Sequence, residues 1–204
     1  MITQAHRVSL VTDRQIPAAG EALAAAFVDD PLCVYTQPDV DARLSQFSWF
    51  FGQLVRDGVE HGGAYCHNSL GRPDGVAVWQ PPQPEDPTPN LEELKKRFGL
   101  EAYQRFVAYR HLERVRSQAM ADRPHWHLSV LGVRPDSQGQ GIGAALLTPG
   151  LRKADQQGLP CYLATFAADD VLFYEHRGFE LIAAGLHLES RIPIWAMKRE
   201  PSSA

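Results

Sequence analysis

Positions 138–143 read Gln-Gly-Gln-Gly-Ile-Gly, between an apolar run typical of a strand and a run typical of a helix. Alternating glycines let successive backbone N–H groups approach an anion, because no Cβ stands in the way. A helix that begins here also directs the positive end of its dipole to the same place. The segment therefore predicts a strand-to-helix turn that binds a phosphate or a diphosphate.

Two common phosphate-binding motifs fit this turn poorly. A P-loop requires Lys and then Ser or Thr after the glycines, but Ala144 and Ala145 follow Gly143. The segment 139–144 does match the G-x-G-x-x-A spacing of dinucleotide-binding folds. Such folds also need an acidic residue about 20 positions later, and the next strand-like run, 161–165, ends without one. A glycine-rich turn that binds no ligand is the structural alternative.

The turn and its flanks resemble the acyl-coenzyme A site of the GNAT N-acetyltransferases. The similar motifs are Gln138-x-x-Gly141-x-Gly143, the preceding segment 133–136 and the segment 173–179, Phe-Tyr-Glu-His-Arg-Gly-Phe. Within that superfamily the chain resembles the puromycin N-acetyltransferases over nearly its whole length. The resemblance implies an α/β fold with a mixed α+β sheet, in which two central strands splay apart and pantetheine lies in the gap.

The resemblance also implies which positions bind acetyl-CoA, the acyl donor. The glycine turn is expected to hold the diphosphate, the strand before it to pair through its main chain with the pantetheine amides, and the region before Tyr174 to complete the site. These positions are Leu131, Val133, Gln138, Gly139, Gln140, Gly141, Ile142, Gly143, Asp170 and Phe173.

Two catalytic roles follow from the same resemblance. Tyr174 matches the tyrosine that GNAT enzymes place beside the thioester sulfur. Since a phenol has a pKa of about 10 and a thiol one of about 8.5, complete proton transfer to sulfur is uphill by roughly 2 kcal/mol. We therefore expect a hydrogen bond that follows the growing negative charge. The backbone N–H of Leu131 is the expected donor to the acyl carbonyl oxygen.

The group that deprotonates the acceptor amine is less well defined by the sequence. An alkylammonium with a pKa near 10.4 needs roughly 4–5 kcal/mol to reach its reactive form at neutral pH, whereas an α-amino group needs much less. His127 is a candidate proton relay, Glu189 is a second, and an ordinary structural histidine is the alternative. Puromycin acetyltransferase-like enzymes carry a glutamate where this chain has Ala164, which leaves the base and the acceptor open.

We therefore expect an N-acetyltransferase that moves an acetyl group from acetyl-CoA to a primary amine of a small molecule by direct attack in a ternary complex. One alternative is a non-catalytic sensor of acyl-CoA. Another is a protein or peptide N-acetyltransferase, which needs an open groove. His125 and His127 alternate on one strand without a nearby cysteine or carboxylate, so no metal is expected.

Composition narrows the setting. With 204 residues and 44% hydrophobic content, residues 1–204 are expected to form one domain with a substantial core. The net charge of −4 does not favour a nucleic-acid partner, so an anionic ligand must be held by local donors. The basic side chains near the turn are Arg134, Arg152 and Lys153.

The sequence also gives expectations about the location of the protein and its oligomeric state. The three cysteines are far apart and odd in number, which indicates reduced thiols in a cytoplasm. The N-terminus lacks the pattern of a signal peptide, and the longest apolar stretch, 22–28, is too short to span a membrane. We expect a cytoplasmic monomer or homodimer.

The chain is expected to alternate strands with helices. Residues 82–122 are interpreted as an insert, a proline-rich connector followed by two helices. Its aromatic residues Tyr103, Phe106 and Tyr109 are candidates to wall an acceptor pocket, although packing against the core is favoured. Predicted strands lie at 8–11, 63–67, 75–79, 126–133, 161–166, 179–182 and 192–198, and predicted helices at 15–27, 41–59, 91–98, 101–120, 141–157 and 169–176.

Overall fold

A seven-stranded sheet forms the centre of the computed structural model, which describes residues 7–69, 71–82, 90–117, 120 and 123–202. The strand order is β1-β2-β3-β4-β5-β7-β6, and every neighbouring pair is antiparallel except β4 with β5. The predicted mixed sheet is therefore confirmed. The strands are β1 Val8–Leu10, β2 Ala64–Ser69, β3 Arg72–Gln80, β4 Trp126–Val133, β5 Cys161–Thr165, β6 Glu180–Leu186 and β7 Pro193–Arg199.

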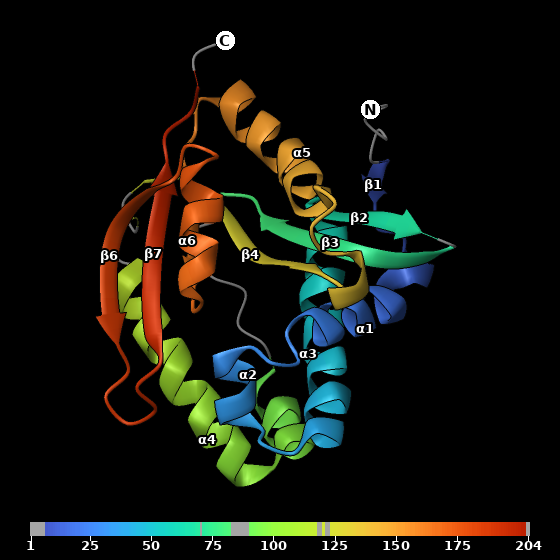
Figure 1. Ribbon diagram of the computed structural model, residues 1–204, viewed down its shortest axis with the longest axis vertical. Coiled ribbons are helices and arrows are strands. Elements are labelled where there is room, and N and C mark those ends of the chain that lie inside the picture. The colour runs from blue at the N-terminus through green and yellow to red at the C-terminus, as the bar shows by residue number, and fades with distance from the viewer. Residues whose placement is uncertain (1–6, 70, 83–89, 118–119, 121–122, 203–204) are drawn as a thin grey trace.

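Helices cover both faces of the sheet (Figure 1). Successive side chains of a strand point to opposite faces, and on β3 Val76 and Val78 pack with α1, α3 and α4, whereas Ala77 and Trp79 pack with α5 and α6. Two apolar cores thus lie on either side of the sheet. The helices are α1 Ile16–Ala26, α2 Pro31–Thr36, α3 Val40–Glu60, α4 Leu91–Ser117, α5 Ile142–Gln157 and α6 Ala168–Glu175.

The parallel pairing of β4 with β5 is short. It joins Trp126 to Cys161 and continues only as far as Leu128 and Leu163. Beyond these residues β4 continues for five residues to Val133 and β5 for two to Thr165, with no ladder between them. The expected splay of the two central strands is therefore present, and it leaves one edge of β4 unpaired.

Helix α4 contains the helices that were predicted for the insert, whereas residues 83–89 of its proline-rich connector lie outside the described residues. Gly99, with φ of 75°, separates the two helical parts of α4, since glycine adopts this left-handed conformation without strain. Phe106 is buried, and its ring centroid lies 4.9 Å from that of Phe50 on α3. Tyr103 is partly buried against the same core, so both pack as favoured. The side chain of Tyr109 lies outside the described residues.

Some local predictions differ from the structure. The short helix α2 was not predicted, because its apolar residues are too few to show a period. β3 begins at Arg72, three residues before the predicted strand at 75–79. The last predicted helix, 169–176, is displaced by one residue, because Ala167 occupies the N-cap position of α6 and Asp169 and Asp170 lie in its first turn. The helix predicted at 141–157 is confirmed, as α5 continues through Pro149 to Gln157.

Candidate active site

The glycine turn connects β4 to α5 through a 3-10 turn at Pro135–Ser137. Gly139 has φ of 74° and Gly141 has φ of 85°, so both adopt the left-handed conformation that favours glycine. Gly141 is the N-cap of α5, and the first N–H groups of a helix have no partner within it. A Cβ at Gly139 would meet no atom within 4 Å. The turn therefore offers open backbone donors suited to a diphosphate.

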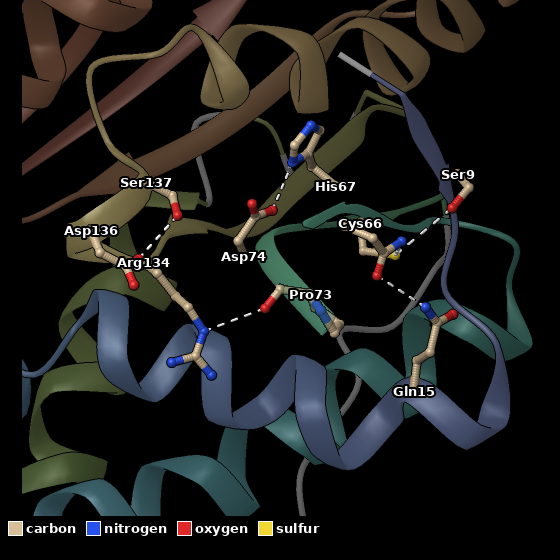
Figure 2. Close-up of polar contacts among 10 residues, drawn as sticks. Ser9, Gln15, Cys66, His67, Pro73, Asp74, Arg134, Asp136 and Ser137 are labelled. Atoms are coloured by element: carbon tan, nitrogen blue, oxygen red, sulfur yellow. Dashed lines mark hydrogen bonds and ion pairs between the residues drawn. The ribbon is translucent and has the colours of Figure 1, made fainter. Parts of the chain in front are cut away.

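The turn is fixed by the β2–β3 hairpin (Figure 2). The backbone N–H of Arg134 donates to the Asp74 carbonyl over 2.8 Å, and its Nε donates to the Pro73 carbonyl over 3.3 Å. The Asp74 carboxylate is buried and lies 2.7 Å from Nδ1 of His67. Gln138 donates from Nε2 to the Val133 carbonyl over 3.0 Å. The sequence did not indicate the His67–Asp74 pair, because no local pattern shows which side chains of a hairpin meet.

The basic side chains predicted near the turn contribute little to it. Lys153 donates to the Gly62 carbonyl over 2.7 Å, and its Nζ lies 5.6 Å from the ring centroid of Tyr65. Arg134 is engaged with Pro73, as described above. Arg152 is exposed. Binding of an anion here therefore depends chiefly on the main chain and the dipole of α5.

Predicted cofactor and catalytic residues from β4, α5 and α6 meet in one apolar cluster. Leu131, Val133, Ile142, Phe173 and Tyr174 all belong to it. Gly143 lies beside Phe173, since a Cβ there would lie 3.4 Å from the Phe173 ring, an ordinary van der Waals distance. The structure therefore brings the glycine turn, the unpaired edge of β4 and Tyr174 to one side of the sheet.

Tyr174 is 7% exposed and packs edge-on against Phe173 and Phe179. Burial raises the pKa of its hydroxyl well above the usual value, and the negative charge of Asp170 adds to this while Arg177 opposes it. The phenol is therefore protonated across the physiological range and remains a hydrogen-bond donor.

Two carboxylates, those of half-buried Asp30 and exposed Asp170, lie near the end of β5. Asp170 accepts a hydrogen bond from Oγ1 of Thr165 over 2.7 Å. Asp30 caps α2 by accepting from the backbone N–H groups of Leu32 and Cys33 over 2.9 and 3.1 Å. Burial raises the pKa of both, and for Asp30 the charge of Asp170 raises it further. In the described part of the chain neither forms an ion pair with a basic side chain.

His127 lies on the opposite face of the sheet from Tyr174. It alternates with Leu128, which packs in the cluster of α5 and α6. Its Nδ1 lies 3.2 Å from Oε1 of Gln80, and its ring centroid lies 5.4 Å from that of Tyr162. His125 instead contacts the Arg123 carbonyl through Nδ1 over 2.7 Å. The Nδ1 atoms of the two histidines thus contact different groups, although both rings lie near that of Tyr162.

The other candidates for the base are placed differently. Glu189 is exposed in the turn between β6 and β7. Ala164 packs in an apolar cluster with Leu32 of α2 and Ile194 of β7. No group of three His, Cys, Asp or Glu side chains suited to a metal ion occurs among the residues that the structure describes.

The cysteines Cys33, Cys66 and Cys161 are buried and unbridged. Burial raises the pKa of Cys33, and it raises that of Cys161 to about 12. The thiols of Cys33 and Cys161 are therefore protonated at neutral pH. Among the described helices, none combines the length and the apolar character that a membrane crossing requires.

Comparisons with known proteins agree with this geometry. An uncharacterised N-acetyltransferase of Schizosaccharomyces pombe is 26% identical over 210 residues, which cover 91% of this chain and 79% of that protein. A Corynebacterium glutamicum structure described as histone acetyltransferase HPA2 and related acetyltransferase has a TM-score of 0.73 at 22% identity, covering 98% and 99% of the two chains. A Drosophila melanogaster polyamine N-acetyltransferase has a TM-score of 0.70 at 16% identity, covering 95% and 99%.

The two solved structures show that this chain shares their fold. The family itself is shown by a match to a protein-family model. The model of the Acetyltransferase (GNAT) family matches residues 69–179, more than half of the chain. This segment contains β4, the glycine turn, α5, β5 and Tyr174. The chain therefore belongs to the Acetyltransferase (GNAT) family and is an acyltransferase.

Proposed function

We propose that this protein transfers an acetyl group from acetyl-CoA to a primary amine of a small molecule, by direct attack in a ternary complex. The observation that carries the proposal is the unpaired edge of β4, which runs between the open glycine turn and the buried hydroxyl of Tyr174. An unpaired strand edge offers N–H and C=O groups to an extended ligand that carries amides. Pantetheine is such a ligand.

The donor fits the residues present. The left-handed glycines and the first turn of α5 suit the diphosphate, and the main chain of Leu131 and Val133 suits the pantetheine amides. In this arrangement Asp170 and Phe173, at the start of α6, border the thioester end. The carboxylate of Asp170 is already held by Thr165, so its contribution would be to shape the site.

Three groups would act on the reacting atoms. The N–H of Leu131 would donate to the acyl oxygen and stabilise the charge that develops there. The Tyr174 hydroxyl would donate to the leaving sulfur, and its raised pKa keeps the proton available. Because the oxygen of Gln80 accepts from Nδ1 of His127, Nε2 is the basic nitrogen of that ring. His127 would therefore take the proton from the amine on the face opposite Tyr174.

The charges near the gap favour a cationic acceptor. Asp30 and Asp170 have raised pKa values and form no ion pair with a basic side chain among the described residues, so an ammonium group would offset their partial desolvation. The Drosophila enzyme with a similar fold forms N-acetylagmatine, the product of such an amine. The resemblance to puromycin N-acetyltransferases supports aminonucleosides as a second class of small amine.

The test has two steps. Calorimetric titration with acetyl-CoA measures donor binding, and thiol release is then followed with a panel of agmatine, an arylalkylamine, an aminonucleoside and peptides with free N-termini. We expect donor binding and turnover with a small amine. Tight binding without thiol release for any amine would favour an acyl-CoA sensor, and release with peptides alone would favour a peptide N-acetyltransferase.

A further inference from the structure

Ser129 interrupts both ladders of β4. On the β3 side Leu128 pairs with Trp79 and Val130 pairs with Val78, so the register skips Ser129. On the β5 side the pairing ends at Leu128. Ser129 is therefore the bulged residue of β4, and it is the first residue beyond the point where the two central strands separate.

The bulge interrupts the alternation of side chains along β4. Leu128 and Leu131 both pack in the cluster of α5 and α6. In a regular strand, two residues on the same face are separated by one residue, but here two residues lie between them. Val130 packs in the cluster on the opposite face. Ser129 therefore lies where the alternation changes phase, two positions after His127 in the same strand.

The hydroxyl of Ser129 is buried without a hydrogen-bond partner among the described residues. Burying an unpaired polar group is unfavourable, and an alanine would avoid this penalty without altering the bulge. Thr165, at the end of β5, already donates to Asp170. The Ser129 hydroxyl therefore suits a partner that arrives with a ligand at the apex of the gap.

We propose that Oγ of Ser129 accepts a hydrogen bond from the reacting amine of the acceptor and orients its lone pair toward the thioester carbonyl. This inference rests on the proposed N-acetyltransferase function. The acyl oxygen is already assigned to the N–H of Leu131, and the sulfur to Tyr174 on the other face. Ser129 would position the amine while His127, two residues earlier in β4, receives its proton, and no covalent bond to Ser129 forms.

The test compares Ser129→Ala with Thr36→Val, a matched control that also removes a buried hydroxyl without a partner among the described residues. We expect Ser129→Ala to lower kcat/KM for the acceptor about tenfold, as the loss of one hydrogen bond implies. The Kd of acetyl-CoA is expected to stay unchanged, and Thr36→Val to match the wild type. Ser129→Thr, which keeps the hydroxyl, is expected to recover most of the loss.

Unchanged acceptor kinetics in Ser129→Ala, equal losses in Thr36→Val, or weaker binding of acetyl-CoA would overturn the proposal. The melting temperature of the free protein provides a second measurement. Because the hydroxyl lacks a partner, Ser129→Ala is expected to be at least as stable as the wild type, and a clear decrease would contradict a role reserved for the ligand. A wild type that binds acetyl-CoA but acetylates no amine would instead refute the proposed function.

Discussion

The carboxyl ends of β4 and β5 differ sharply, although the two strands are parallel neighbours. The end of β4 continues into an exposed turn whose donors are backbone groups, with two glycines in the left-handed conformation. The end of β5 instead presents side-chain groups: buried Thr165 donates to Asp170, and buried Tyr174 lies one helical turn further on. From this comparison we propose that the junction after β4 binds the acyl donor and that the junction after β5 contributes to the transfer reaction.

The largest effect is expected at the first junction. Gly141→Val places a β-branched side chain at φ of 85°, which costs about 1–3 kcal/mol of strain and disturbs the adjacent N–H groups. We expect the affinity for acetyl-CoA, measured by calorimetry, to fall by about 100-fold or more. Gly158→Val is the matched control, since Gly158 is equally left-handed at the far end of α5. Equal affinity losses in both variants would contradict a specific role for the turn.

At the second junction, Tyr174→Phe separates chemistry from binding. Loss of a hydrogen bond to a developing charge is expected to reduce kcat by about 10–100-fold, while the Kd of acetyl-CoA stays unchanged. Since burial raises the pKa of Tyr174 well above 10, the defect should be the same at pH 7 and pH 9. A loss of acetyl-CoA affinity as large as the loss of kcat would show that binding and chemistry are not separated between the two junctions.

The third prediction concerns the opposite face of β4. His127→Gln is expected to lower kcat/KM about tenfold for a strongly basic alkylamine, because such an amine must lose a proton before attack. The loss should be smaller for an amine whose pKa is near 8. Thiol release with the two amines measures the difference, and an equal loss with both would argue for a structural histidine.

The smallest effect is expected for Asp170→Asn. Burial raises the pKa of Asp170 above 3.8, so the folded state binds this proton more tightly than the unfolded state. The contribution of Asp170 to stability therefore decreases as the pH rises from about 4 through its folded pKa. We expect the variant to melt at a slightly higher temperature at pH 7, by less than about 4 °C, and to lose this advantage at pH 4. A lower melting temperature at pH 7 would show that the hydrogen bond from Thr165 outweighs desolvation.

The structure of the junction after β4 could be predicted from the sequence, whereas that of the junction after β5 could be predicted only in part. Gly139, Gly141 and Gly158 mark backbone conformations that other residues adopt with strain, so turn and helix ends were predicted closely. The side-chain contacts of Asp170 with Thr165 and of Asp74 with His67 depend on register and tertiary packing, which no local pattern encodes. The bulge at Ser129 was missed for the same reason, since an alternating apolar pattern does not show which residue a neighbouring strand skips.

The short ladder between β4 and β5 has a consequence for local unfolding and for degradation of the protein. Only three residue pairs connect the N-terminal and C-terminal parts of the sheet along this seam, so we expect amide protons there to exchange with solvent sooner than those of the β2–β3 hairpin. A substrate that bridges the seam would act as a removable extra strand. The concentration of this substrate would then determine how often the chain opens locally and becomes accessible to proteases. The amount of this protein in the cell would therefore follow the supply of its substrate.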